Sequence, residues 1–266
     1  MSTESTSSRF EDIREKFGRF RILIVGRANA GKTTILQKIC NTTESPEIYD
    51  GKGNKIDPSQ LEGSMGRGIH DIENELIFRS NGKFVFHDSQ GFEGGRKDEF
   101  VRMKTFIADR ANTTHLKERL HAIWYCIPMD KIDRAIQRSE EMFFEECDSN
   151  NVPVVVLFTK FDALRVKALV KLAPADRRLA LQGGLPKIRP LMEEIFNGAD
   201  AWGRLSKMTY PPKTSVRLEN IHKANEGCNI LIENTASVLN DEALQMLFVS
   251  AQETNIALCI KYTVQR

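Results

Sequence analysis

The chain has 266 residues, of which 41% are hydrophobic and 28% charged. This balance is typical of a folded globular protein and excludes disordered and fibrous classes. The formal net charge of +2 is too small for a protein that mainly neutralises a nucleic-acid backbone. Five cysteines without a CxxC pair favour buried thiols in a reducing compartment. No apolar run is long enough to cross a bilayer or to form a signal peptide, so we expect a cytoplasmic protein with no clear nucleic-acid or transmembrane association.

The first residues of the chain are rich in Ser, Thr and Glu and have little to bury. Residues 1–17 are therefore predicted to form a flexible N-terminal tail that leads into a short polar helix around Phe10–Phe17. Residues 18–266 are predicted to form the globular domain.

Five apolar runs rich in branched residues recur along the chain, and a helical pattern follows each of them. The runs span Arg21–Gly26, Phe84–Ser89, Ala122–Met129, Val152–Phe158 and Met246–Ser250. Helices are predicted at Lys32–Cys40, near Glu99–Arg110, at Arg134–Cys147 and after Thr254. This alternation predicts an α/β fold, in which a mostly parallel sheet forms the middle of three layers and helices cover both faces.

Two segments depart from the simple alternation. Glu73–Arg79 precedes the second run across Ser-Asn-Gly, which predicts a hairpin and one antiparallel edge strand. The stretch between the last two predicted strands is far longer than one crossover helix, so we expect a largely helical insertion at about residues 163–243. Its first part is basic, which suits either a solvated helix face, the reading we favour, or a surface for an anionic membrane or partner.

The octet Gly26–Thr33, GRANAGKT, fits the pattern GxxxxGK[ST] and lies between a predicted strand and a predicted helix, as a P-loop requires. Backbone N–H groups of Asn29, Ala30 and Gly31, together with the helix N-terminus, are expected to surround phosphates. Lys32 is expected to neutralise the β- and γ-phosphate oxygens, and the Thr33 hydroxyl to bind Mg²⁺. Thr34 is a helix residue with a potential phosphate contact.

Three further motifs follow strand predictions. Asp88 and Gly91 form a DxxG pattern, in which the carboxylate holds Mg²⁺ through water and the glycine amide senses the γ-phosphate. Thr159, Lys160 and Asp162 resemble the [NT]KxD element of GTPases, whose Asp accepts two donors that guanine has and adenine lacks. Ser250, Ala251 and Gln252 resemble the SAK element, whose alanine amide meets guanine O6.

The order of these motifs makes the chain resemble a P-loop GTPase of the translation-factor class over about Phe20–Arg266, apart from the insertion. RFRILIVGRANAGKTTIL and LHAIWYCIPMD also resemble uncharacterised fungal G-domain proteins. Septins and the immunity-associated AIG1-type GTPases are more distantly similar. The resemblance implies a guanine-nucleotide-binding protein that binds GTP or GDP with Mg²⁺, hydrolyses GTP slowly as a molecular switch, and acts on a protein effector that the sequence does not identify.

The catalytic residues of the resembled family are only partly present, with Lys32, Thr33, Asp88 and Gly91 as the candidates. Phe92 stands where Ras-like GTPases carry a catalytic Gln. GTPases with this change often recover activity by pairing across their nucleotide sites, which implies a nucleotide-dependent homodimer. Gln90 or Glu93 could substitute for the Gln, or both are exposed loop residues. The alternative is a non-hydrolysing GTP-binding scaffold or assembly module, whereas a small-molecule kinase has no use for the Thr159–Asp162 element.

The first switch and the monovalent-cation site stay open. In Gly63–Glu73 the nearest hydroxyl for Mg²⁺ is Ser64, with His70 near the expected threonine, and Arg67 is either an arginine finger or a solvated side chain. Asn29 matches an asparagine that binds K⁺ in tRNA-modification GTPases, although an ordinary loop asparagine explains it too.

Other prominent residues are interpreted as structural. His87, Trp124 and Tyr125 lie in apolar strand patterns and are expected in the core. The acidic stretch Ser139–Asp148 predicts an amphipathic helix with a solvated face.

Overall fold

The computed structural model describes residues 11–13, 15–57, 71–89, 97–181, 188–223 and 228–251. Its strands are β1 (Phe20–Gly26), β2 (Glu47–Tyr49), β3 (Lys55–Ile56), β4 (Glu75–Phe78), β5 (Asn81–Asp88), β6 (Ala122–Pro128), β7 (Val154–Thr159) and β8 (Thr214–Arg217). Its α-helices are α2 (Lys32–Ile39), α4 (Lys97–Asn112), α5 (Arg138–Glu146), α6 (Leu164–Lys171), α7 (Pro174–Leu181), α8 (Ile188–Gly198), α9 (Ala201–Leu205), α10 (Asn229–Val238) and α11 (Glu242–Ala251). Short 3₁₀ helices are η1 (Leu116–Glu118), η2 (Met129–Arg134) and η3 (Phe161–Ala163).

All eight strands join one sheet in the order β3-β2-β4-β5-β1-β6-β7-β8. The five neighbouring strands β5, β1, β6, β7 and β8 are parallel, which confirms the predicted mostly parallel sheet. β4 pairs antiparallel with β5, as the hairpin prediction required. β4 is not the edge strand, however, because β2 and β3 extend the antiparallel region beyond it. These two strands have three and two residues, too short to show an alternating pattern in the sequence.

The predicted last strand is wrong. Met246–Ser250 lies inside helix α11, and the strand that completes the sheet is β8. A short apolar run suits a buried strand and a buried helix equally well, and hydrophobic periodicity alone does not separate them. β8 has the sequence TSVR with one buried residue, so it gave no apolar signal.

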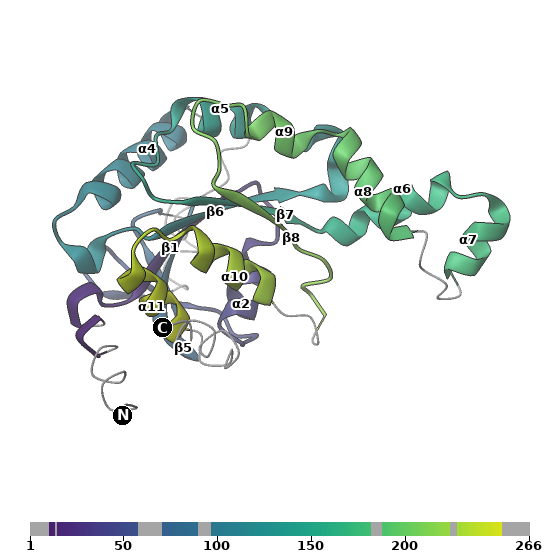
Figure 1. Ribbon diagram of the computed structural model, residues 1–266. Helices are drawn as coiled ribbons and strands as arrows, with labels where there is room; N and C mark the ends of the chain where they lie inside the picture. Colours follow the sequence, from purple (N-terminus) through teal and green to yellow (C-terminus); the bar gives the residue numbers. More distant parts are fainter. Residues whose placement is uncertain are drawn as a thin grey trace.

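This correction also changes the extent of the expected insertion, because β8 belongs to the sheet and lies within residues 163–243. Between β7 and β8 the structure has η3 and helices α6 to α9. Figure 1 shows α6 and α7 extending beyond the sheet, whereas α10 and α11 return beneath it.

Two apolar layers cover the sheet, as the three-layer prediction states. In β1, Leu23 and Val25 pack in the layer of α4, α5, α6, α8 and α9, while Ile22 and Ile24 pack in the layer of α2, α10 and α11 (Figure 1). Residues 11–13 and 15–17 are helical. Ile13 and Phe17 in this segment are buried in the second layer, so the predicted polar helix has an apolar face that packs on the domain.

Several residues are buried as expected. Trp124 and Tyr125 are fully buried, and so are the four described cysteines, Cys40, Cys126, Cys147 and Cys228. Burial raises the pKa of the Cys126 thiol to about 12, which keeps it protonated and inert. Across the described ranges, no helix is both long enough and apolar enough to cross a membrane.

Candidate functional site

A cleft of about 1300 Å³ opens where the parallel strands end. Arg27 follows β1, Asp88 ends β5, Pro128 ends β6 and Lys160 follows β7, and all four line the cleft. The carboxyl ends of parallel strands are where α/β sheets bind ligands. The full lining is Arg27, Ala28, Asn29, Ala30, Gly31, Lys32, Thr33, Thr34, Asp88, Ser89, Glu99, Pro128, Asp130, Lys131, Gln137 and Lys160.

The octet predicted as a P-loop forms one wall of this cleft. Gly26 has φ +146°, and a Cβ there would lie 2.5 Å from the Cys126 carbonyl oxygen of β6, so only glycine fits. Asn29 and Gly31 both have positive φ, 59° and 86°, which turns successive backbone N–H groups toward one concave side. Gly31 then precedes α2, whose first turn contains no acidic side chain. The positive end of α2 and these amides together make an anion-binding surface.

Lys32 and Asp88 stand opposite each other at the cleft. The Lys32 ammonium donates to the Gly26 carbonyl oxygen at 2.9 Å and lies 3.7 Å from the Asp88 carboxylate. Thr33 and Thr34 follow in the first turn of α2 and line the same cleft. A cation, a carboxylate and a hydroxyl therefore meet beside the concave loop.

Lys160, which follows β7, lines the far end of the cleft, and the loop after β8 contacts the same segment. The buried Thr159 hydroxyl donates to the Ala30 carbonyl oxygen at 2.8 Å, which joins this end to the P-loop. Lys160 has left-handed backbone angles, and its ammonium lies 2.9 Å from Asp130. The Asp162 carboxylate accepts a hydrogen bond from the backbone N–H of Asn220 at 2.8 Å.

The segment that contacts Asp162 is thus the loop after β8. The sequence analysis placed Ser250, Ala251 and Gln252 at this end of the site, as a SAK-like element after the last strand. The carbonyl oxygen of Ser250 accepts from Lys83 and that of Ala251 from Asn81, at the amino-terminal start of β5. Asp88 lies at the other end of β5, so Ser250 and Ala251 lie where the parallel strands begin and do not line the cleft. The error has the same cause as the wrong strand, because the motif was placed after Met246–Ser250. Gln252 lies outside the described residues.

Arg27 is a cleft residue that the sequence analysis missed. Its guanidinium is buried, donates to the carbonyl oxygens of Arg134 and Ala135, and lies 3.2 Å from the carboxylate of Glu140. Glu141, Glu145 and Glu146 of α5 are exposed, as the predicted solvated face requires, but Glu140 is fully buried. Burial raises the pKa of the Glu140 carboxyl, and the Arg27 charge opposes that shift. More than a hundred residues separate the two partners, so no local pattern could pair them.

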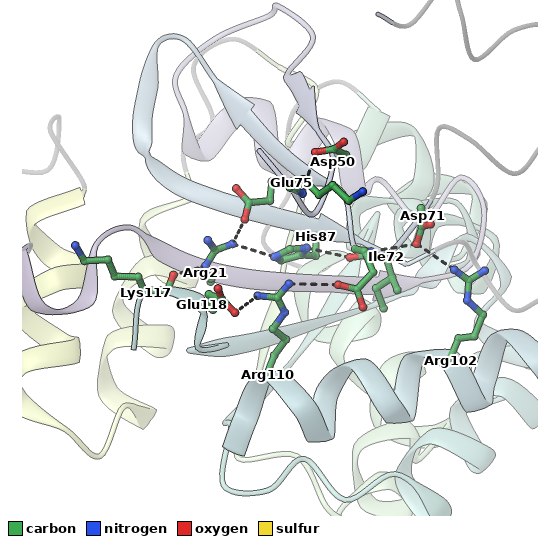
Figure 2. A network of polar contacts seen from close by, with 12 residues as sticks. Arg21, Asp50, Asp71, Ile72, Glu75, His87, Arg102, Arg110, Lys117 and Glu118 are labelled. Carbon is green, nitrogen blue, oxygen red and sulfur yellow. Dashed lines mark hydrogen bonds and ion pairs between the residues drawn. The ribbon is translucent and has the colours of Figure 1, made fainter. Parts of the chain in front are cut away.

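A second polar network surrounds His87, the residue before Asp88 in β5 (Figure 2). The ring of His87 is buried, with Nδ1 2.9 Å from the Ile72 carbonyl oxygen and Nε2 3.3 Å from the guanidinium of Arg21. Because Arg21 can only donate, Nε2 is the acceptor and Nδ1 donates to Ile72. Desolvation lowers the His87 pKa to about 3. The burial of the ring and its two contacts confirm the prediction of a satisfied core histidine. Two ion pairs, Asp71–Arg102 and Glu73–Arg110, join the same segment to α4.

Several predicted catalytic residues lie outside the described residues. They are Ser64, Arg67 and His70 of the candidate first switch, and Gln90, Gly91, Phe92 and Glu93 after β5.

The donors at the cleft suit Mg²⁺, which prefers oxygen ligands and keeps several waters. Thr33 and Asp88 line it, and the buried Ser89 hydroxyl has no hydrogen-bond partner among the described residues. Within the described ranges, no three His, Cys, Asp or Glu side chains gather as a metal site. A metal ion held here would share its shell with oxygens of a bound ligand, as it does in nucleotide phosphate complexes.

A comparison with curated proteins gave no match. A model of the 50S ribosome-binding GTPase family matches residues 21–160, which is just over half of the chain. The match begins in β1, includes the whole P-loop and Asp88, and ends at Lys160 on the far side of the cleft. The chain belongs to the 50S ribosome-binding GTPase family.

Proposed function

We propose that this protein binds GTP and GDP with Mg²⁺ and hydrolyses GTP slowly as a molecular switch. The proposal rests on one observation: residues typical of phosphate binding and a residue typical of guanine recognition lie toward opposite ends of the same cleft. A P-loop with Lys32 and Thr33 forms one end, and Asp162 stands beyond the other, beside the lining residue Lys160.

Guanine selectivity is proposed to rest on Asp162. A carboxylate can accept both N1–H and the exocyclic amine of guanine, whereas adenine presents no such pair of donors. The N–H of Asn220 already donates to one oxygen of this carboxylate and fixes its orientation. Thr159 supports this end from behind through its bond to Ala30, and Lys160 is proposed to lie along the base.

The phosphate chemistry is proposed to use residues of the near end. The amides of Asn29, Ala30 and Gly31 bind phosphate oxygens, and Lys32 exchanges its carbonyl partner for the β- and γ-phosphates. Thr33 and Asp88 would hold Mg²⁺, the latter through water, and the ion supplies positive charge that stabilises the transferring phosphoryl group. Gly91 is proposed to sense the γ-phosphate through its amide.

Hydrolysis is proposed to be slow because Phe92 cannot orient water. The competing function is a GTP-binding scaffold that does not turn over. Both are tested by measuring the affinity for GTP, GDP and ATP with and without Mg²⁺, followed by single-turnover hydrolysis. Tight Mg²⁺-dependent GTP binding with slow phosphate release supports the switch, and tight binding without release supports the scaffold. Equal affinity for ATP would contradict guanine recognition.

Two accessory features are also proposed, and each has its own measurement. A nucleotide-dependent homodimer should make specific activity rise with protein concentration and should show in light scattering with a GTP analogue but not with GDP. A K⁺ ion at Asn29 should make hydrolysis faster in KCl than in NaCl at equal ionic strength. The left-handed backbone at Asn29 gives a separate reason for asparagine, so identical rates in the two salts would remove the K⁺ role.

A further inference from the structure

The connection from β6 to α5 forms a third wall of the cleft. It contributes Asp130, Lys131 and Gln137 to the lining, next to Pro128 at the end of β6. The wall begins with η2, which runs from Met129 to Arg134.

This wall is fixed in place by its own side chains. Ile132 is buried in the core, and Asp130 pairs with Lys160 at 2.9 Å. Asp133 pairs with Lys167 of α6. The wall is therefore held on its inner side by the core, and on its outer side by the residues that follow β7.

Arg27 fastens the same wall to the P-loop. Its guanidinium donates to the Ala135 carbonyl oxygen at 2.8 Å and contacts Glu140 at 3.2 Å. Both side chains are nearly or completely buried, so this is a fixed contact and not a solvated ion pair. The position of η2 is thereby tied to the loop that surrounds the phosphates.

Lys131 is turned differently from its neighbours on η2. Its backbone angles, φ −124° and ψ 58°, depart from the helical values of the turn, and it is one of the residues that line the cleft. The other three cations of the lining are engaged, since Arg27 contacts Glu140, Lys160 contacts Asp130, and Lys32 contacts the Gly26 carbonyl oxygen. Lys131 has no ion-pair or hydrogen-bond partner in the part of the chain that the structure describes.

We propose that Lys131 binds the phosphate chain of the bound nucleotide, as a cation supplied by the β6–α5 connection in addition to Lys32. An ammonium group at the wall of a cleft gains most from an anion, and a charge-assisted hydrogen bond is stronger than a neutral one. This inference rests on the proposed function, because it assigns one more residue to the same nucleotide.

The test compares Lys131→Ala, Lys131→Arg and Lys131→Glu with the wild-type chain by calorimetric titration with GMP, GDP and GTP in Mg²⁺ at one ionic strength. The Ala variant should lose about tenfold in GTP affinity, and the Glu variant more. The Arg variant should stay near the wild type. The loss should grow from GMP to GTP, because each added phosphate brings more negative charge.

Arg138→Ala is the matched control, since Arg138 is an exposed cation at the start of α5 outside the cleft lining. It should bind all three nucleotides like the wild type. An unchanged thermal midpoint for Lys131→Ala would show that the fold is intact, as expected for an exposed side chain.

Wild-type affinity in both Lys131→Ala and Lys131→Glu would overturn the inference while leaving GTP binding in place. An equal loss for GMP, GDP and GTP would also overturn it, because the contact would then be to the ribose or base. If the wild-type chain bound no guanine nucleotide in the presence of Mg²⁺, the proposed function and this inference would both fall.

Discussion

The two ends of the cleft differ in how the chain builds them. The end proposed to bind the phosphates, here the phosphate end, is one continuous stretch, Gly26–Thr34, in which Asn29 and Gly31 both have positive φ. The end proposed to bind the base, here the base end, is assembled from the residues after β7 and the loop after β8, which meet through the hydrogen bond between Asp162 and Asn220. Between these two segments the chain forms helices α6 to α9.

This difference determines which substitutions should disrupt the structure of each end. A continuous loop depends on local backbone geometry and on what holds it from below, here Arg27 and Glu140. An assembled end depends on the sheet, because β7 and β8 must be in register before Asp162 meets its partner. Changes to single residues can therefore test the two ends separately.

At the phosphate end, Lys32→Ala should have the largest effect. Without the ammonium the phosphate oxygens lose their main positive charge, and GTP affinity should fall by about 1,000-fold. The fold should persist because Lys32 lies at a site and not in the core. Fluorescence titration with a labelled GTP analogue measures the loss, and wild-type affinity in this variant would refute the P-loop assignment.

Below the phosphate end, Glu140→Gln should reduce stability by about 3 kcal/mol, because it leaves the buried Arg27 guanidinium without its counter-charge. The adjacent Glu141→Gln is the control. Glu141 pairs with Arg204, but both side chains are about half exposed, so its loss should be below about 1 kcal/mol. Urea denaturation of the two variants gives the comparison, and equal free energies of unfolding would show that the buried pair adds nothing.

At the base end, Asp162→Asn should lower GTP affinity by about 100-fold and shift preference toward xanthosine nucleotides, since the amide presents a donor where guanine also donates. Ser250→Ala should leave affinity unchanged, because Ser250 belongs to α11 at the other edge of the sheet. Competition between GTP and XTP measures the shift. A Ser250→Ala effect as large as that of Asp162→Asn would restore the discarded motif.

The end of the sheet at which the parallel strands begin lies away from the cleft and provides a separate test of stability. His121 is buried there, its Nδ1 accepts from the backbone N–H of Arg21, and desolvation lowers its pKa to about 3. The unfolded chain, with a pKa near 6.5, then binds one more proton between about pH 6.5 and pH 3. Stability from this group is complete above pH 6.5 and is lost as the pH falls, by up to about 1.4 kcal/mol per pH unit.

His121→Asn retains an acceptor for Arg21 but removes the titrating ring. Its free energy of unfolding should therefore depend less on pH between 6.5 and 4 than that of the wild type, whatever its value at neutral pH. Parallel slopes for the two proteins in urea denaturation would exclude His121 as a source of acid sensitivity.

The sequence predicted most of the sheet and the phosphate end because their signals are local. β1, β5, β6 and β7 are apolar runs, β1, β5 and β7 end at motif residues, and α2 follows directly from the octet. β8 escaped because its pairing with β7 creates the strand, whereas its own four residues are mostly polar. Arg27 and Glu140 escaped for a related reason, since each looks solvated until the fold brings them together. Lys131 became a candidate only through its place on the wall of the cleft.

Gly26, the first residue of the P-loop pattern, is required for a reason that does not involve nucleotide binding. At Gly26 a side chain is excluded by the Cys126 carbonyl oxygen of the neighbouring strand, which is part of the sheet and not of any ligand. A relative that had given up nucleotides altogether would still need glycine there to keep β1 against β6. In this chain, Gly26 is therefore required by the packing of the sheet, and the inference of nucleotide binding depends on Lys32, Thr33 and the residues across the cleft.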